Sequence, residues 1–218
     1  AIIALNKTTG EVISGQGIIP DGFQHYILKY DDNSVYPFAK LEYVYYRMAL
    51  DAGISMMPSE LRTYDGITHF LTQRFDRNGN EKIHTQTLAA MSPTSDSYED
   101  IFAVIRRLNL PYEDSRQQYL RMIFNVIARN VDDHSKNFSF CMNRDGAWRL
   151  SPAYDLTYSV DPTAPPYSNR HSLTVNGKNE DITYEDFETI ALNNDIQEYK
   201  ALIDSVANAI ANFEGYAK

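Results

Sequence analysis

The sequence predicts an α+β protein with two lobes, a small strand-rich N-terminal lobe and a mostly helical C-terminal lobe. Between residues 1 and 75, short apolar runs of strand-like composition are separated by turn signals such as KTTG and Asp65-Gly66. After DRNGN at 76–80, longer segments have apolar residues at helical spacing. We therefore expect a division into an N-lobe over residues 1–77 and a C-lobe over residues 78–218.

The N-lobe is expected to contain one helix among its strands. PFAKLEYVYYRMALDAG (37–53) is apolar at helical spacing, and Gly53 is a typical residue to follow the end of a helix. The segment SGQGIIPDG (14–22), with its lone Gly-x-Gly, is interpreted as a connection between strands. The expected strands span residues 1–5, 11–14, 23–30, 59–64 and 67–75.

The C-lobe is expected to combine helices with one short hairpin. FSFCM and AWRLS flank the turn NRDG and predict two strands, at 138–142 and 147–151. SVDPTAPPYSN (159–169) is a Pro-rich loop. The expected helices span residues 97–109, 113–130, 184–193 and 196–213.

Composition and charge exclude several classes of protein. The formal net charge is −9, whereas a protein that binds the nucleic-acid backbone needs clustered Lys and Arg. A single cysteine, Cys141, excludes an internal disulfide framework and a Cys-based zinc site. No apolar stretch is long enough to cross a bilayer. We expect a cytoplasmic protein without direct contacts to nucleic acid or membrane.

The segment NVDDHSKN (130–137) is strongly polar and directly follows an apolar helix. Four residues separate Asp132 from Asn137, which is the Asp-to-Asn spacing of a kinase catalytic loop. In such a loop the Asp accepts the proton of the attacking hydroxyl and the Asn holds a magnesium ion. His134 is placed to donate to the transferring phosphate. The spacing predicts that Asp132 is essential and that its neighbour Asp133 is replaceable.

Two further segments supply the other groups that such a site needs. The hairpin leads into SPAYDL (151–156), which is expected to bring Asp155 beside the polar loop. Mg²⁺ bound to ATP takes only one or two protein oxygens besides the phosphates. Lys29 ends a strand, and Glu42 lies near the start of the following helix. A strand Lys on the phosphates, steadied by a helix Glu, is the other half of a kinase site.

Four segments, taken together and in this order, resemble the HipA family. They are RFDR (74–77), DDHSKN (132–137) followed by NFSF, LSPAYDL (150–156) and RHSLTVNGKNEDIT (170–183). HipA-family proteins are bacterial Ser/Thr kinases that serve as toxins of toxin–antitoxin modules. The resemblance covers nearly the whole chain and implies a bilobal protein-kinase-like fold that uses ATP and Mg²⁺.

The resemblance also implies a role for each matched residue. Asp132 becomes the proton acceptor, Asn137 and Asp155 the metal ligands, and Lys29 the phosphate-binding lysine. Helices of the family need not form the ion pair that Glu42 would make. Backbone groups of the strand before the hinge are expected to bind the adenine edge. The nucleotide-binding residues implied are Lys29, Gln73, Arg74, Phe75, His134, Ser135, Lys136, Asn137, Tyr154 and Asp155.

By the same resemblance, the protein substrate is expected to be a translation factor such as an aminoacyl-tRNA synthetase. The expected partner is a DNA-binding antitoxin that makes the operator contacts. Family members place a Gly-rich phosphate loop, with a Ser that becomes autophosphorylated, before the first strand seen here. We expect that loop upstream of Ala1, so that the chain is a fragment or a trimmed part of a longer protein.

Other interpretations of these residues stay open at this point. Taken singly, Asp132 is typical of a helix end and Lys29 of a strand end at the surface. Asp76 and Arg77 are interpreted as a structural ion pair that braces the hinge. Two other classes of function also remain. One is a nucleotide-binding pseudokinase that only scaffolds a partner, and the other is a metal-dependent phosphohydrolase that uses Asp132, Asp133 and Asp155.

Overall fold

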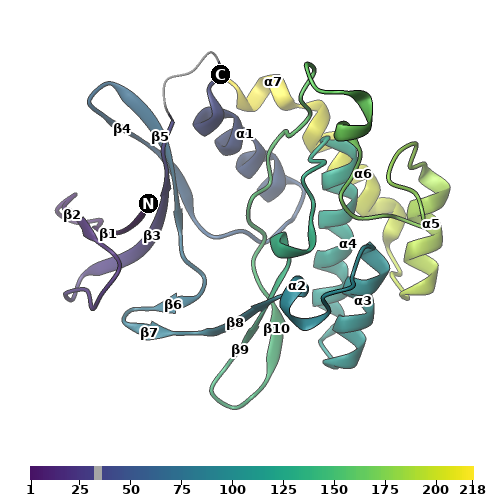
Figure 1. Ribbon diagram of the computed structural model, residues 1–218, viewed down its shortest axis with the longest axis horizontal. Coiled ribbons are helices and arrows are strands. Elements are labelled where there is room, and N and C mark those ends of the chain that lie inside the picture. Colours follow the sequence, from purple (N-terminus) through teal and green to yellow (C-terminus); the bar gives the residue numbers. More distant parts are fainter. Residues whose placement is uncertain (32–35) are drawn as a thin grey trace.

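The computed structural model describes residues 1–31 and 36–218, and Figure 1 shows a sheet-rich part beside a mostly helical part. The α+β class expected from the sequence is confirmed. The strands are β1 (Ile2–Asn6), β2 (Val12–Ser14), β3 (Phe23–Lys29), β4 (Ser59–Tyr64), β5 (Ile67–Gln73), β6 (Arg77–Asn78), β7 (Glu81–Lys82), β8 (His84–Thr87), β9 (Ser139–Met142) and β10 (Trp148–Leu150). The helices are α1 (Phe38–Asp51), α2 (Leu88–Met91), α3 (Tyr98–Arg107), α4 (Tyr112–Ile127), α5 (Tyr184–Asn193), α6 (Tyr199–Ala211) and α7 (Phe213–Tyr216), with short 3₁₀ turns at Ser135–Asn137 and Pro166–Asn169.

The first five strands form one antiparallel sheet in the order β2-β1-β3-β5-β4 (Figure 1). Side chains along the central strand β3 alternate between the two faces of this sheet. Tyr26 and Leu28 are buried on one face, in a small core with residues of β1 and β5. Ile27 and Lys29 lie on the other face and line a cavity that the sheet shares with the helical part. Strand alternation therefore places Lys29 over that cavity.

The end of α1 follows the sequence expectation closely. Gly53 has φ +84°, a left-handed conformation that glycine adopts without steric cost. Its N–H donates to the Leu50 carbonyl at 3.0 Å, and the Ile54 N–H donates to the Ala49 carbonyl at 2.9 Å. This pair of bonds is the Schellman motif, which satisfies the last carbonyls of a helix. After this turn the chain continues into Ser55 and Met56, which pair with Ala153 near the candidate site.

The segment 14–22 connects β2 to β3, as the sequence analysis interpreted it. A side chain at Gly15 would lie 2.4 Å from the Ile3 carbonyl oxygen, so this position accepts only glycine. Ile19 is buried, and its N–H and carbonyl bond the side chain of Asn80 at 2.8 and 2.9 Å. The segment therefore packs against β1 and the β6–β7 hairpin, away from the cavity lining.

A three-stranded sheet of order β10-β9-β8 joins the two parts of the fold. Strands β9 and β10 correspond to the expected hairpin. Strand β8 was not expected, because HTQT has neither an apolar run nor alternation. Its register with β9, His84 opposite Met142 and Thr87 opposite Ser139, provides the backbone partners that its own sequence does not signal. The preceding β6–β7 hairpin was missed for the same reason.

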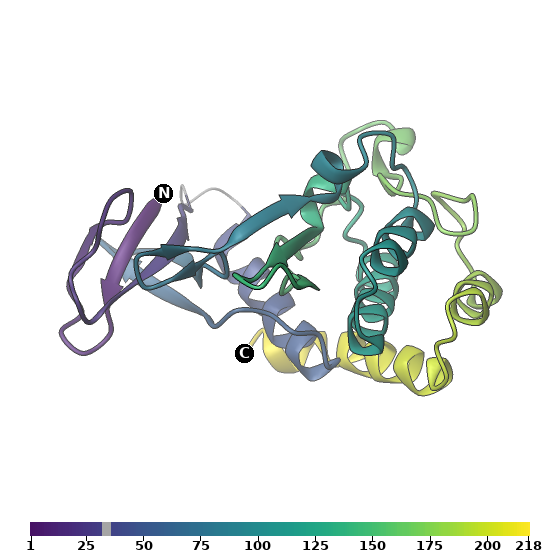
Figure 2. The ribbon, with the colours of Figure 1, turned by 90° about the horizontal axis from the view of Figure 1, so that it is seen from below.

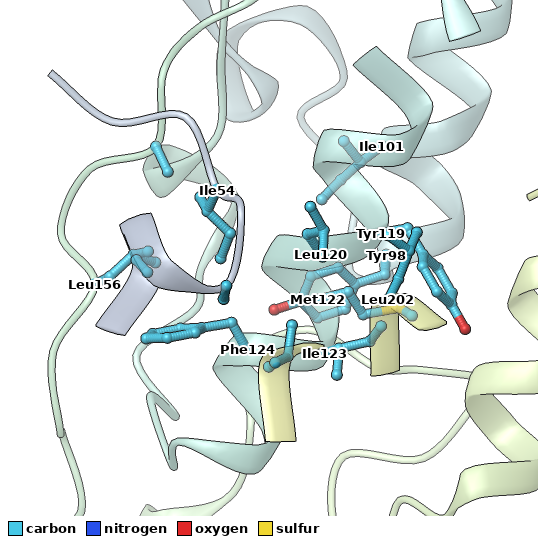
Figure 3. Close-up of a cluster of buried hydrophobic side chains, with 14 of the residues drawn as sticks. Ile54, Tyr98, Ile101, Tyr119, Leu120, Met122, Ile123, Phe124, Leu156 and Leu202 are labelled. Carbon is cyan, nitrogen blue, oxygen red and sulfur yellow. The ribbon is translucent and has the colours of Figure 1, made fainter. Parts of the chain in front are cut away.

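Helix α4 lies at the centre of the helical part and carries the main hydrophobic core. Figure 3 shows its buried Leu120, Ile123 and Phe124 beside Ile101 of α3 and Leu202 of α6. The helix ends at Ile127, earlier than expected, because Arg129 takes a left-handed φ of +59°. Within the described residues, no helix is both long and apolar enough to span a membrane.

The main core also contains residues that the expected division assigns to the N-lobe. Val44, Tyr45 and Met48 of α1 are buried in the same cluster as α4. Figure 2 shows α1, in dark blue, beside the yellow C-terminal helices, which Figure 1 labels α6 and α7. The division at residue 77 stays a prediction. Helix α1 nevertheless packs against both parts, with buried residues in the main core and others against Phe70 of β5.

We expect Asp186 to stabilise the start of α5 in a pH-dependent way. Its buried carboxylate accepts hydrogen bonds from the Thr183 N–H at 2.8 Å, Asn176 at 2.9 Å and Lys178 at 2.9 Å. Burial raises the pKa of Asp186, but these hydrogen bonds outweigh it and lower the pKa to about 2. Asp186→Ala should therefore lower the free energy of unfolding by about 2 kcal/mol at pH 7.

Because the pKa of Asp186 is lower in the folded chain, its contribution is fully present above its unfolded value and is lost as the pH falls through the folded value. The difference in urea midpoint between wild type and Asp186→Ala should shrink between about pH 4 and pH 2. A difference that stays constant over this range would contradict the assignment.

Candidate active site

The polar loop predicted as catalytic follows α4 and presents Asp132 to the surface. The Asp132 side chain is 66% exposed, and Nε2 of His134 lies 3.8 Å from its carboxylate. Its backbone is held on both sides. The Asp132 N–H donates to the Ser159 hydroxyl at 3.0 Å, and the Asn137 side-chain amide donates to the Asp132 carbonyl at 2.9 Å. The loop backbone is therefore fixed while the Asp132 carboxylate stays accessible.

Asp133, expected to be replaceable, is instead the anchor of this loop. It has no exposed surface, and its carboxylate accepts hydrogen bonds from Tyr98 at 2.7 Å and the Ser172 N–H at 2.7 Å. His171 Nδ1 lies 2.9 Å from the same carboxylate. The expectation rested on the Asp132-to-Asn137 spacing, which carries no information on burial, and the buried contacts of Asp133 argue against it. Of the two adjacent aspartates, Asp132 therefore faces solvent and Asp133 lies in the core.

Asp155 reaches the site through a contact that no local pattern signals. The segment before it pairs with the chain that follows α1: the Ala153 N–H donates to the Ser55 carbonyl at 2.8 Å, and Met56 and Ala153 form a parallel bridge. Asp155 itself has φ +53°, a left-handed conformation that is uncommon outside glycine. Such conformations often occur at functional sites, where the surroundings hold them in place.

Lys29, Glu42 and Asp155 come together at one point. Lys29 Nζ lies 2.6 Å from Glu42 Oε1 and also forms a short ion pair with Asp155 Oδ1. Burial lowers the pKa of Lys29, but the two carboxylates outweigh it and raise the pKa above its usual value. Burial raises the pKa of Glu42, against the effect of Lys29. The ion pair with Glu42 that the resemblance left open is present.

This charged group lies on the wall of a cavity of about 340 Å³ between the sheet and the helical part. Residues of β3, α1, β5 and the segment 153–155 form its walls. Apolar side chains such as Ile27, Met56 and Phe70 form much of its surface. The cavity therefore has an apolar compartment and a charged end, which suits a ligand with a planar base and phosphates.

Gln73, Arg74 and Phe75 of the hinge after β5 line the cavity, and two of their backbone groups have no partner among the described residues. The Gln73 N–H donates to the Pro58 carbonyl at 3.0 Å. In an antiparallel sheet, two such residues usually exchange two hydrogen bonds. Pro58 has no N–H to donate to the Gln73 carbonyl, so this carbonyl can accept a hydrogen bond from another donor. Within the described residues, the Phe75 N–H has no acceptor. An acceptor and a donor two residues apart can together bind the edge of a base.

The side chains around the hinge brace it. Arg74 makes a bidentate contact with Asp76, at 2.8 and 2.7 Å, and Arg77 bonds the same carboxylate at 2.7 Å. The expected ion pair of Asp76 and Arg77 is therefore present. The Phe75 ring stacks on Tyr154, with centroids 5.5 Å apart. Burial raises the pKa of Tyr154 to about 12, so its hydroxyl stays protonated and donates to the Lys136 carbonyl at 2.8 Å.

Comparison with known proteins agrees with this geometry. A family model described as the HipA-like C-terminal domain matches residues 3–213. The chain belongs to this family. "Putative kinase Y4mE" of Sinorhizobium fredii is 27% identical to the HipA-like domain over 130 residues, which cover 52% of this chain and 31% of that protein. The HipA-like domain thus spans less than a third of this relative.

Two solved structures share the fold of this HipA-like domain. One is the complex of HipA, HipB and operator DNA from the toxin–antitoxin system of Shewanella oneidensis MR-1. It matches with a TM-score of 0.70 and 16% identity, over 88% of this chain and 52% of the other. The other is the proinflammatory kinase CtkA of Helicobacter pylori, with a TM-score of 0.56 and 12% identity, over 91% of this chain and 89% of the other. At these identities the matches show a common fold.

The HipA-like domain brings most of the predicted site residues to one cavity. Asp132, His134, Ser135 and Asn137 lie on the adjoining loop and do not line it. Sequence reasoning missed the apolar lining and Thr87, which gave no signal because their positions depend on packing between distant segments. The predicted residues that line the cavity are Lys29, Gln73, Arg74, Phe75, Lys136, Tyr154 and Asp155.

The oxygen atoms available suit a magnesium ion that arrives with a nucleotide. The Asn137 amide nitrogen donates to the Asp132 carbonyl, which leaves its Oδ1 as an available ligand. Oδ2 of Asp155 has no hydrogen-bond partner in the described part of the chain. Two hard oxygen ligands match the one or two protein ligands typical of Mg²⁺ held mainly by phosphates. The described residues contain no group of three or more His, Cys, Asp or Glu that could hold a metal by itself.

Proposed function

We propose that the chain is the catalytic region of an ATP- and Mg²⁺-dependent protein serine/threonine kinase of the HipA type. The observation that carries this proposal is the meeting of Lys29, Glu42 and Asp155 at a cavity beside a loop with Asp132 and Asn137 at kinase spacing. These five residues come from four separate segments of the chain. Family membership supports the same conclusion.

The residues divide the work of phosphoryl transfer in the following way. The Gln73 carbonyl and the Phe75 N–H bind the base edge, and Lys29 binds the α- and β-phosphates. A magnesium ion held by Asn137 and Asp155 would neutralise charge on the β- and γ-phosphate oxygens. The hydroxyl oxygen of the substrate attacks the γ-phosphorus while Asp132 accepts its proton. The bond from phosphorus to the bridging oxygen breaks, and ADP leaves with the electron pair.

For the substrate we propose a protein of the translation machinery, such as an aminoacyl-tRNA synthetase, on the basis of the resemblance to HipA toxins. For the partner we propose a DNA-binding antitoxin. The Shewanella oneidensis structure contains HipA with HipB and operator DNA. A net charge of −9 favours an arrangement in which the partner makes the DNA contacts.

The two other classes of function are less well supported. A metal-dependent phosphohydrolase needs a preassembled set of metal ligands, and the described residues form none. Asp133, which that mechanism would use, is buried and bound by core groups. A pseudokinase scaffold would not need the exposed Asp132 carboxylate. Transfer of labelled phosphate from ATP to a protein, by the natural full-length polypeptide, separates a kinase from both.

We expect Lys29→Met to weaken ATP binding by about tenfold or more, because the variant loses the cation that contacts the phosphates and leaves Glu42 without its partner. The dissociation constant for ATP, measured by calorimetry with and without Mg²⁺, tests this. Lys40→Met is the matched control. Lys40 is an exposed lysine of α1 that does not line the cavity. Equal ATP affinity in wild type and Lys29→Met would contradict the assigned role.

A further inference from the structure

Asn130, the residue at the start of the polar loop, lies between the two segments that carry the catalytic groups. Its side chain is buried, with 2% of the residue exposed. One side-chain N–H donates to Asn125 Oδ1 on α4 at 3.0 Å, and the other reaches the Asp155 carbonyl at 3.4 Å. Its Oδ1 accepts a hydrogen bond from the Ser159 hydroxyl at 3.3 Å. Both donors and the acceptor of the amide are therefore in use.

Ser159 extends this connection to the catalytic loop. Its hydroxyl donates to Asn130 and at the same time accepts the N–H of Asp132 at 3.0 Å. The backbone of Asp132 and the backbone of Asp155 are thus linked through only two side chains, Ser159 and Asn130. The Asp155 carbonyl that Asn130 holds belongs to a residue with φ +53°, a conformation that needs such support.

The other end of the connection is anchored in the core. Asn125 donates to the Tyr98 hydroxyl at 2.9 Å, and Tyr98 donates to Asp133 at 2.7 Å. Asn130 and Asp133, both in the polar loop, are therefore connected through the side chains of Asn125 and Tyr98. A closed and buried network of this kind has a single low-energy arrangement, because each unpaired member is costly in a low-dielectric interior.

We propose that Asn130 is a positioning residue for phosphoryl transfer, which couples the loop of Asp132 to the segment of Asp155 and sets the geometry between the two carboxylates. The proposal rests on the proposed kinase function, since the two carboxylates act on opposite sides of one phosphoryl group. Only an asparagine supplies two donors and an acceptor at this side-chain length. An aspartate at this position has no donor for Asn125 or the Asp155 carbonyl, and a glutamine is too long for the space.

The kinetic test uses Asn130→Ala and Asn130→Asp in the full polypeptide. A misplacement of about 1 Å at a reacting centre lowers the rate by about 100-fold, so kcat should fall by about 10- to 100-fold. The KM for ATP should change by less than about threefold, because Asn130 does not line the nucleotide cavity. A fall in kcat of less than about threefold, or a parallel loss of ATP affinity, would overturn the proposal.

Ser159 provides a second pair of variants that carries little risk of misfolding, since it is only partly buried on a loop. Ser159→Ala should lower kcat, and Ser159→Thr, which keeps the hydroxyl, should restore it. Because Ser159 acts through Asn130, the double variant Asn130→Ala/Ser159→Ala should lose little more than Asn130→Ala alone. Multiplicative losses would show that the two side chains act independently. Ser205→Ala on α6 is the matched control, expected at wild-type kcat.

Amide hydrogen exchange tests the coupling without any need for kinase activity. In Asn130→Ala, exchange at 130–137 and at 155–159 should rise together by about tenfold, while α4 stays protected. A rise in one segment alone, or a uniform rise that includes α4, would overturn the proposal. If the wild-type protein transfers no phosphate, the proposed function fails, and the exchange measurement still decides whether Asn130 couples the two segments.

Discussion

Asp132→Asn is expected to lower kcat for phosphoryl transfer by about 10²- to 10⁴-fold, the usual contribution of a positioned general base. The asparagine cannot accept the proton of the attacking hydroxyl, although it keeps the size of the side chain. Stability should not change, because the Asp132 side chain is 66% exposed and Nε2 of His134 lies 3.8 Å from its carboxylate, beyond hydrogen-bond distance. Transfer of labelled γ-phosphate, ATP affinity and the midpoint of thermal unfolding are the measurements.

Asp204→Asn is the matched control for this variant, since Asp204 is exposed on α6, outside the cavity lining. It should keep wild-type activity, and both variants should bind ATP as the wild type does. If Asp132→Asn keeps more than about a third of the wild-type kcat, then Asp132 is not the proton acceptor. If activity falls only in step with ATP affinity, the role of Asp132 is in binding and not in the chemical step.

Asp133→Ala is expected to be the most destabilising substitution, with a loss of about 3–5 kcal/mol in the free energy of unfolding. It removes a fully buried acceptor and leaves the Tyr98 hydroxyl, the Ser172 N–H and His171 unpaired. Asp133→Asn should also destabilise, because an asparagine keeps only one acceptor oxygen and its NH2 group would face a donor, either the Tyr98 hydroxyl or the Ser172 N–H. Urea unfolding at neutral pH, followed by circular dichroism, measures both variants.

The adjacent residue supplies the control. Asp132→Asn should unfold at the wild-type urea concentration but have a strongly lowered kcat, whereas Asp133→Asn should unfold at a lower concentration. Equal urea midpoints for Asp133→Asn and wild type would contradict the structural role of Asp133. Variants of these two neighbours should therefore affect different quantities, kcat for Asp132 and the free energy of unfolding for Asp133. The difference is expected because the Asp132 carboxylate is exposed and the Asp133 carboxylate is buried.

Those parts of the candidate site that depend on residues close together in the sequence were predictable. The spacing of Asp132 and Asn137 is local, and a loop of that length limits where the two side chains can lie. Lys29 was predictable as the end of a strand and Glu42 as a residue near the start of the next helix, whereas their ion pair was left open until the structure showed it. The end of α1 at Gly53 was predictable from backbone sterics alone.

The missed features all depend on partners that are distant in the sequence. Strand β8 is polar and becomes a strand only because β9 lies beside it. The free Gln73 carbonyl depends on Pro58, which lies just before the neighbouring strand β4. The position of Asp155 depends on the pairing of Ala153 with the segment after α1. Burial of Asp133 depends on Tyr98 and His171, which lie far from it on either side.

By itself, the sequence determined the α+β class, the order of most elements and the residues that could perform phosphoryl transfer. These depend on periodicity, turn chemistry and spacing, which act over a few residues. The tertiary structure alone decided that Asp133 is buried while its neighbour Asp132 stays exposed. It also placed Asn130 between the polar loop and the segment of Asp155. Both outcomes arise from burial and long-range hydrogen bonds, because a polar group removed from water takes whatever partner the fold brings to it.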